Sequence, residues 1–421
     1  MKRWLVGLAL AASVSVGFVG LAQKTTITYW QYAYDTRVQA MDQLIQQFEQ
    51  ANPDITVKQE TFPYNAYQQQ VAASLPAGQG ADVVQLYYGW LDTWLRSGYV
   101  EALPSQYFDT AALDSAFIPM VQAAKRNGQY YGLPTAVRSL ALFYNKDMFK
   151  AAGIDGPPAT WDQFVQDAKA LTKKSGPRFT QVGFGIAPNG QGHNLLREVL
   201  IRQFGGQPYS ADGTQVAYDS EAGLKAFEFY TGLVTKDQVA VLNFVPGDNG
   251  YRDGFIQLQN IAMIVDGSFA IGSVKAGAQF DWGVAEIPTL ANGVKSDFGS
   301  FWMNGLTPNA FKDPAKLEAA SKFLQFVTSP DAMKLWLNVV GELPARASLV
   351  DDPSLASDPV YGPFIKSLAY SHATQFVDET AQRQVFMDAV NRVVLEHQDP
   401  AAVWSQAAKE EQAILDKAQN P

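Results

Sequence analysis

The sequence contains no cysteine and only three histidines among its 421 residues. Disulfide bonds, thiol nucleophiles and thiolate metal sites are therefore excluded. His193, His372 and His397 lie far apart and lack the close spacing of a zinc site, so we expect no metal ion. Basic runs are also missing, and 41 acidic residues outnumber 32 basic ones, which argues against a nucleic-acid partner or an anionic membrane surface.

Motifs for nucleotide binding and nucleophilic hydrolysis are missing too. Gly183 and Gly185 lack the third glycine that opens a helix in a dinucleotide-binding fingerprint, and the sequence has no P-loop. Ser139, Ser268 and Ser300 lack the G-x-S-x-G context of a hydrolase nucleophile. We therefore expect no cofactor, no catalytic residue and no enzyme. A glycoside hydrolase or lyase needs only two carboxylates, and the sequence leaves that alternative open.

Long apolar runs are confined to the start of the chain. Residues 5–19 are apolar after two basic residues, and Gly20 and Ala22 place small side chains before a cleavage site. This pattern predicts a signal peptide over residues 1–22 that is cleaved after Ala22. An uncleaved anchor is the alternative, although the run is short for a span of about 20 residues. Because no cysteine follows the run, we expect a soluble periplasmic protein and not a lipoprotein.

The remaining chain alternates strands and helices. A hydrophobic fraction of 47% is typical of a globular protein, and the length suggests two or three domains. Strand, helix, strand, helix and strand at the start indicate a parallel α/β sheet. Strands are expected at 25–32, 55–61, 81–87, 140–144, 182–186 and 261–265. Helices are expected from Thr36 to about residue 51 and at 64–75, 90–96, 161–173, 221–234, around 251–257, and at 317–327, 332–340, 385–396 and 400–418.

Aromatic residues gather where the first three expected strands end. In an open α/β sheet the carboxyl ends of the strands face the ligand crevice. Aromatic rings suit the apolar CH faces of sugar rings, and nearby polar groups can bond the hydroxyls. Core packing is the alternative for any single ring, whereas the group favours a binding site. The group is Trp30, Tyr32 and Tyr34; Phe62 and Tyr64; and Tyr87, Tyr88 and Trp90.

The most specific pattern in the chain is P-x-x-x-x-x-L-x-x-x-Y-N-K-D from Pro134 to Asp147. It resembles the first interdomain crossing of family 1 extracellular solute-binding proteins, the group that includes the maltodextrin-binding proteins. Further similar segments follow in the same order and spacing. They are ADVV at 81–84, MIVDGSF at 263–269, FGSF at 298–301, FLQFVTSPDA at 323–332 and GELPARAS at 341–348.

The resemblance implies a type II periplasmic-binding-protein fold, in which each lobe is a mostly parallel sheet flanked by helices. It places residues 23–139 and 303–346 in one lobe and residues 140–302 and 347–421 in the other, with the ligand cleft between them. It further implies a monomer that closes on a small-molecule carbohydrate and docks onto the permease subunits of an ABC transporter in the inner membrane.

Candidate ligand-binding residues follow from the same resemblance. Arg138 lies where maltodextrin binders have a cleft acid, and Phe269 where they have a stacking tryptophan. Asp266 would accept hydrogen bonds from sugar hydroxyls, or instead cap the helical turn after it. Arg346 lies in the last crossing, where an interlobe ion pair is the alternative. The full predicted set is Trp30, Tyr32, Tyr64, Tyr88, Trp90, Arg138, Asn194, Asp266, Phe269, Gly299, Ser300, Phe301 and Arg346.

Arg138 departs from the family pattern. A guanidinium can donate forked hydrogen bonds to sugar hydroxyls, but it also binds carboxylates and phosphates. The exchange of an acid for Arg138 therefore puts maltose itself in doubt. A glycerol-phosphate ligand or an acidic sugar remains an alternative within the same family.

Overall fold

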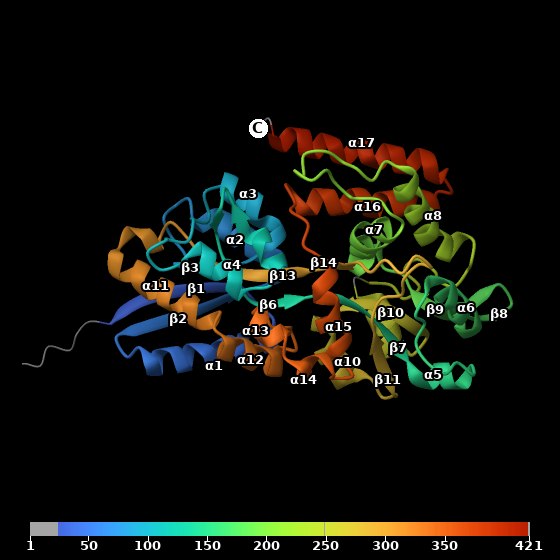
Figure 1. Cartoon of the computed structure of the whole chain (residues 1–421), viewed down its shortest axis with the longest axis horizontal. Helices are drawn as coiled ribbons and strands as arrows, with labels where there is room; N and C mark the ends of the chain where they lie inside the picture. Colours follow the sequence, from blue (N-terminus) through green and yellow to red (C-terminus); the bar gives the residue numbers. More distant parts are fainter. Residues whose placement is uncertain (1–23, 248, 420–421) are drawn as a thin grey trace, which may run out of the picture.

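The structure is a computed structural model that describes residues 24–247 and 249–419. The predicted signal peptide and its cleavage site after Ala22 lie outside the described residues. The chain forms two lobes side by side, each built on a five-stranded sheet with helices around it (Figure 1). The predicted α/β fold with two lobes is therefore confirmed.

The sheet of the first lobe has the strand order β2-β1-β3-β13-β6. β1 (Thr25–Tyr32) pairs in parallel with β2 (Ile55–Phe62) and with β3 (Val83–Tyr87). β13 (Ser300–Leu306) is antiparallel to both β3 and β6 (Leu133–Arg138). Every strand except β13 thus runs toward the second lobe, whereas β13 enters from that lobe and must run the opposite way. β13 starts before the boundary at residue 303 that the sequence suggested.

The sheet of the second lobe has the order β11-β7-β10-β9-β8 and is mixed, not mostly parallel. β7 (Leu140–Asn145) leaves the crossing and is antiparallel to β10 (Ile261–Gly267) and β11 (Trp282–Ala285). β9 (Arg178–Gly185) is parallel to β10, and β8 (Lys173–Ser175) forms a hairpin with β9. The carboxyl ends of β9 and β10 consequently face the first lobe.

Helices cover the sheets and start at side-chain caps where the sequence supplies them. Thr160, Ser220 and Ser329 each accept a hydrogen bond from a backbone N–H in the first turn of the helix that follows, which is α6 (Trp161–Leu171), α8 (Glu221–Thr235) and α12 (Pro330–Val340) respectively. Around the first lobe lie α1 (Asp35–Ala51), α2 (Tyr64–Ser74), α3 (Leu91–Arg96), α4 (Thr110–Ala116), α11 (Pro314–Val327), α12 (Pro330–Val340) and α13 (Ala347–Val350). Around the second lie α5 (Lys146–Ala151), α6 (Trp161–Leu171), α7 (Ile201–Gln203), α8 (Glu221–Thr235), α9 (Gly250–Ile256), α10 (Ile271–Gly277), α14 (Pro353–Ala356), α15 (Gly362–Ser367), α16 (Glu379–Val394) and α17 (Pro400–Gln419).

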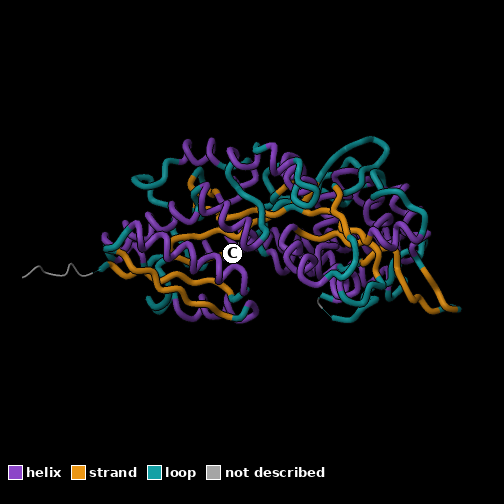
Figure 2. The backbone as a smooth tube through the Cα atoms, turned by 90° about the horizontal axis from the view of Figure 1, so that it is seen from below, coloured by secondary structure: helices purple, strands orange, loops and turns teal. Residues whose placement is uncertain are grey.

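The chain passes between the lobes as extended segments, which Figure 2 shows from below. β6 continues through Ser139 into β7, and β12 (Asp297–Phe298) continues through Gly299 into β13. β12 pairs with the short β14 (Ser371–His372), which leads to α16. A small two-stranded sheet, β4 (Lys125–Arg126) with β5 (Gln129–Tyr130), completes the strands. Such neighbouring crossings form a hinge that can change the angle between the lobes.

Two buried apolar clusters stabilise the lobes in the absence of disulfide bonds. One fills the first lobe and continues under the crossings to Phe143 and Ile264, and the other surrounds Trp161 and Trp404 in the second lobe. Within residues 24–247 and 249–419, no helix has both the length and the apolar character to cross a membrane.

Candidate functional site: the cleft between the lobes

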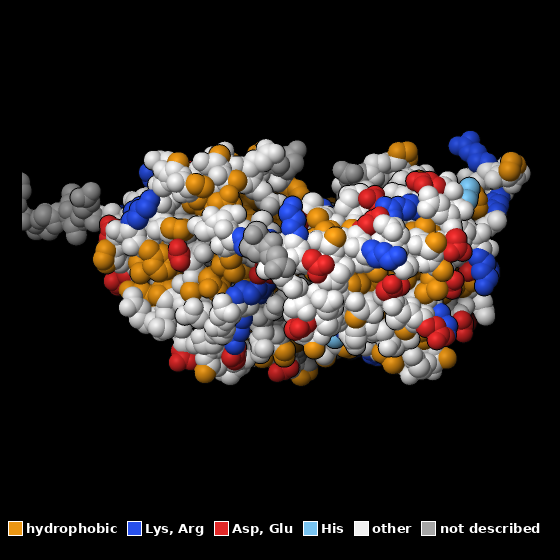
Figure 3. All heavy atoms as spheres, turned by 90° about the horizontal axis from the view of Figure 1, so that it is seen from above, with side chains coloured by type: hydrophobic (Ala, Val, Ile, Leu, Met, Phe, Trp, Pro, Cys, Tyr) orange, Lys and Arg blue, Asp and Glu red, His pale blue; other side chains and the backbone are white. Residues whose placement is uncertain are grey.

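A cavity of about 630 Å³ lies between the two lobes and is lined by both of them. The surface is notched between the lobes in the view from above (Figure 3). Sites for small molecules are usually concave, between about 300 and 1,000 Å³, and common at domain interfaces. This cleft is therefore the candidate ligand site.

The wall contributed by the first lobe is aromatic. Trp302 stands at its centre, with its ring centroid 4.5 Å from that of Tyr32, 5.7 Å from Tyr87 and 6.2 Å from Tyr64. Tyr32 and Tyr87 end β1 and β3, and Trp302 pairs directly with Tyr87 across β3 and β13. The rings from separate strands thus form one continuous surface against which a flat apolar face can stack.

The wall contributed by the second lobe is polar and rich in amides. It comes from a helical segment that begins at Pro188, from α9 with the residue before it, from the turn after β10, and from α16. Side-chain amides both donate and accept hydrogen bonds, as the hydroxyls of a sugar require. The lining residues on this side are Asn189, Gly190, Gln191, His193 and Asn194; Asn249, Tyr251 and Arg252; Phe269; and Glu379, Arg383, Gln384 and Met387.

A buried carboxylate holds two arginines at the hinge. Glu342 Oε1 accepts hydrogen bonds from Arg37 Nη2 and Arg138 Nε, both at 2.5 Å, and Oε2 accepts one from Trp336 Nε1 at 2.8 Å. Burial opposes the charge of Glu342, but Arg138 and Arg37 outweigh it and lower the pKa of Glu342 to about 2. Burial and the neighbouring Arg138 lower the pKa of Arg37 to about 10. Both arginines line the cleft, and Glu342 lies behind them.

In the second lobe, Asp266 is the buried carboxylate that holds an arginine of the cleft. It is fully buried and accepts hydrogen bonds from Arg252 Nε at 2.8 Å and from the Tyr251 hydroxyl at 3.1 Å. Arg252 and Tyr251 line the cleft, whereas Asp266 does not. Phe269 lies between two arginines, with the guanidinium of Arg138 5.1 Å and that of Arg252 5.6 Å from its ring centroid.

The structure brings six of the residues predicted from the sequence to the cleft and leaves seven outside it. Whether any of them contacts a ligand stays a prediction. Tyr32, Tyr64, Arg138, Asn194, Phe269 and Ser300 line the cavity, and Trp30, Tyr88, Trp90, Asp266, Gly299, Phe301 and Arg346 do not.

Strand alternation and a tight turn explain why three of these seven predicted residues lie outside the cleft. On β13, Ser300 and Trp302 face the cleft, so Phe301 between them points to the opposite face and is fully buried. Tyr88 starts a 3₁₀ turn that directs its ring onto Phe301, with centroids 4.8 Å apart. Trp90 ends the same turn and packs behind the wall against Trp302 at 5.0 Å.

Contacts with neighbouring residues keep three more of the predicted residues away from the cleft. Trp30 donates from Nε1 to Glu60 and is 4% exposed. Arg346 donates to the backbone oxygen of Thr328 and stacks on Phe117, within the first lobe and away from the cavity. A Cβ at Gly299 would lie 2.6 Å from Met120 Sδ, the flexible end of a side chain that can shift, so packing favours glycine at this crossing without requiring it.

The sequence did not lead us to predict several of the cleft residues, above all Trp302, Arg37 and Arg252. The signal for Trp302 was present, because alternation along a strand that exposes Ser300 to the cleft predicts the same for residue 302. Arg37 lies on α1 among the residues of its buried face, where a helical pattern predicts apolar side chains.

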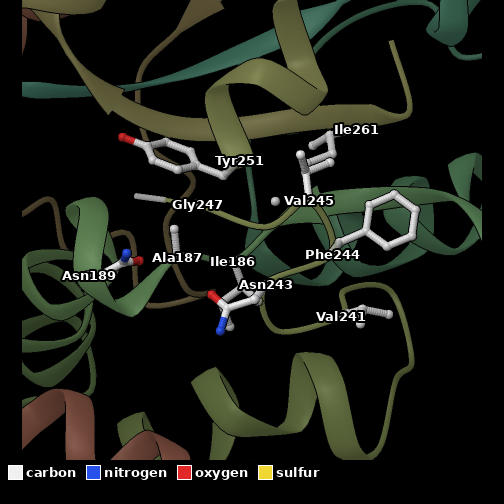
Figure 4. A pocket seen from close by; sticks show the side chains of 11 residues that line it. Ile186, Ala187, Asn189, Val241, Asn243, Phe244, Val245, Gly247, Tyr251 and Ile261 are labelled. Atoms are coloured by element: carbon white, nitrogen blue, oxygen red, sulfur yellow. The ribbon is translucent and has the colours of Figure 1, made fainter. Parts of the chain in front are cut away.

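A second pocket lies behind the polar wall (Figure 4) and is much smaller. Its volume is about 10 Å³, and Ala187, Val245 and Tyr251 are among its lining residues. A cavity of this size holds about one water molecule. It offers no room for a solute. A further pocket of about 480 Å³, with Tyr144, Lys150 and Asp281 in its lining, lies on the second lobe alone, whereas the interlobe cleft is lined by both lobes and is the candidate site.

His193 in the cleft wall predicts a loss of stability in mild acid. Burial, followed by the nearby Arg197, lowers the pKa of His193 to about 3 from an ordinary value of 6.5. The unfolded chain therefore binds a proton that the folded chain does not, and stability falls as the pH drops from about 6.5 toward 3. We expect this residue to cost about 2 kcal/mol of unfolding free energy at pH 5 relative to pH 7.

Urea unfolding at pH 7 and pH 5 checks this expectation. His193→Gln should flatten the decline between the two pH values, whereas His397→Gln, at an exposed position, should leave it unchanged. An equal decline in the wild type and in His193→Gln would contradict the assignment.

Comparison with known proteins agrees with this architecture. A sequence profile of the family described as bacterial extracellular solute-binding protein matches residues 43–363. The maltotriose-binding protein of Pyrococcus abyssi is 23% identical, over 82% of this chain and 72% of that protein. The sn-glycerol-3-phosphate-binding periplasmic protein of Shigella dysenteriae is 26% identical, over 82% and 80%. The crystal structure of the GacH receptor of Streptomyces glaucescens superposes with a TM-score of 0.80 at 21% identity, over 93% of this chain and 99% of that one.

Proposed function

Because the chain belongs to the bacterial extracellular solute-binding protein family, we propose that it is the periplasmic substrate-binding component of an ABC importer and that its substrate is a di- or oligosaccharide. The single observation that carries the substrate class is the pairing of an aromatic wall with an amide-rich wall across one cleft. Sugar rings present apolar CH faces and a rim of hydroxyls, and the two walls match these two surfaces.

Relatives named for a saccharide support the same class of solute, whereas a relative named for sn-glycerol 3-phosphate supports a phosphorylated solute. One of them is named for maltotriose and another for sn-glycerol 3-phosphate, and the GacH receptor was solved with acarbose. A saccharide also suits the room available, since the cleft of about 630 Å³ exceeds what a single small ion or amino acid needs.

Capture would work by closure of the lobes around the solute. The aromatic wall can bind the ring faces in the open state, and the polar groups of the second lobe can reach the hydroxyls only when the lobes approach. Ligand contacts made solely in the closed state shift the equilibrium toward it. The closed arrangement then offers one fixed surface to the permease subunits in the inner membrane. In the same proposal the protein is a monomer, is cleaved after Ala22 and carries no lipid.

A glycoside hydrolase is the rival of another class, and the cleft argues against it. Glycosidases place two carboxyl groups on either side of the scissile bond. Among the described residues that line the cleft, Glu379 is the one carboxylate, and it pairs with Arg383 at 3.4 Å. The part of the lining that the structure describes thus lacks the acid pair that hydrolysis requires.

A thermal-shift screen of residues 23–421 against mono-, di- and oligosaccharides tests the proposal. A solute that binds only the folded protein raises its unfolding midpoint, by about 2.7 kcal/mol of added stability at a hundred times its Kd. We expect a shift with a group of related saccharides and full recovery of the sugar after incubation. A shift with no saccharide, or release of hydrolysis products, would contradict the proposed function.

A further inference from the structure

Charge is not balanced at the hinge end of the cleft. Arg252 has Asp266 at 2.8 Å and Arg383 has Glu379 at 3.4 Å as partners, one carboxylate for each guanidinium. Arg37 and Arg138, by contrast, share the single carboxylate of Glu342. One positive charge is therefore left uncompensated among these cleft residues, in a place that protein atoms shield from water.

Hydrogen bonding at the same place is also incomplete. Arg37 Nε and Nη1 and Arg138 Nη2 are buried and have no hydrogen-bond partner among the described residues. Arg37 is 2% exposed, and its guanidinium lies 5.0 Å from the ring centroids of both Tyr32 and Tyr34, which line the cleft. Buried donors are rarely left without an acceptor, so each unpaired one requires an explanation.

An oxyanion would satisfy both needs at once. A sugar hydroxyl can accept a hydrogen bond but brings no charge, whereas a carboxylate or phosphate supplies negative charge and two oxygens that can accept parallel hydrogen bonds from one guanidinium group. Ser300 pairs directly with Arg138 across β13 and β6 and lines the cleft, so its hydroxyl is a further donor beside the guanidinium.

The charged site adjoins the aromatic wall. Ser300 and Trp302 lie on the same face of β13, and Tyr32 contacts both the ring of Trp302 and the guanidinium of Arg37. A ligand that stacks its ring on Trp302 and Tyr32 can thus place a substituent at the arginines. The charged group and the ring can therefore belong to one molecule.

We propose that Arg37, Arg138 and Ser300 form an oxyanion subsite and that the saccharide captured by this protein carries one negative charge on a ring substituent. This inference rests on the proposed function and narrows its substrate class. Glu342 acts as a positioning residue, since it fixes both guanidinium groups from behind without lining the cleft itself.

Titration calorimetry tests the inference by comparing the affinities of anionic sugars with those of their neutral counterparts. The probes are galacturonate with galactose, glucuronate with glucose, the corresponding 1,4-linked disaccharides, glucose 6-phosphate and glycerol 3-phosphate. We expect an anionic sugar to bind at least tenfold more tightly than its neutral partner. Arg138→Gln should abolish this preference and leaves Arg37 and Glu342 as a neutral pair. Arg178→Gln removes the same charge at the exposed start of β9 and should keep the preference.

A second measurement needs no knowledge of the natural sugar. Sulfate should raise the unfolding midpoint of the wild type and of Arg178→Gln more than that of Arg138→Gln, at ionic strength matched with chloride. An equal effect on all three proteins would overturn the subsite.

The outcomes separate the two proposals. Neutral sugars that bind as tightly as their anionic partners would overturn the oxyanion subsite and leave the proposed function intact. Binding of glycerol 3-phosphate alone, lost in Arg138→Gln, would support the subsite and overturn the saccharide. Absence of a shift with every saccharide of the thermal screen, together with no specific sulfate effect, would overturn both.

Discussion

Replacing Trp302 by alanine is expected to weaken saccharide binding by about 2–4 kcal/mol, a loss of roughly 30- to 1,000-fold in affinity. The ring stands at the centre of the aromatic wall and contacts Tyr32, Tyr87 and Tyr64. Its removal takes away one stacking surface and also the support of three others. Residues of this kind, large and central in a desolvated patch, dominate binding energies. Calorimetry with the best ligand from the screen gives the measurement.

Two variants separate stacking from a general loss of structure. Trp302→Phe retains a ring and should keep most of the affinity. Phe301→Leu alters the neighbouring residue, which is fully buried on the opposite face of β13, and should lower the unfolding free energy with little effect on affinity. An unchanged affinity in Trp302→Ala would remove the aromatic wall from the binding site, and the proposed function would lose its principal support.

The elements at the start of the chain could be predicted from the sequence because their signals are local. β1 has the predicted bounds, and α1 ends at Ala51, before the predicted Asn52-Pro53 stop. The prediction that aromatic rings from several strand ends meet in one place holds for four of the eight rings, Tyr32, Tyr34, Tyr64 and Tyr87. It rests on strand direction alone, since parallel strands end at the same edge of a sheet.

The rest of the cleft depends on contacts that no local pattern encodes. Glu342 meets Arg37 across 305 positions in the sequence, and Arg138 across 204. The insertion of β13 between β3 and β6 is what brings Trp302 to the wall, and strand order cannot be deduced from the strand itself. Tyr88 was predicted at the site because it follows β3, and a single 3₁₀ turn was enough to point it into the core.

Replacing Glu342 by glutamine should have the largest effect on stability. Glutamine has nearly the same shape but no charge, so Arg37 and Arg138 would face each other in the hinge without a counter-charge. Removing one partner of a buried ion pair typically costs about 3–5 kcal/mol, and we expect a loss of this size in urea unfolding at pH 7. Glu318→Gln breaks a solvent-exposed pair with Lys322 at 2.7 Å and should cost less than about 1 kcal/mol.

The pH dependence of this loss identifies the carboxylate as its origin. The pKa of Glu342 falls from an ordinary 4.5 to about 2 in the folded protein, so its stabilisation is complete above about pH 4.5 and disappears as the pH falls toward 2. The difference in unfolding free energy between wild type and Glu342→Gln should therefore shrink across that interval.

Adding Arg138→Gln to Glu342→Gln removes one of the two uncompensated charges and should recover part of the lost stability. The double variant could instead be less stable than Glu342→Gln by the full cost of Arg138→Gln alone. In that case the two residues would not be coupled. This outcome would contradict both the positioning role of Glu342 and the charge imbalance at the hinge.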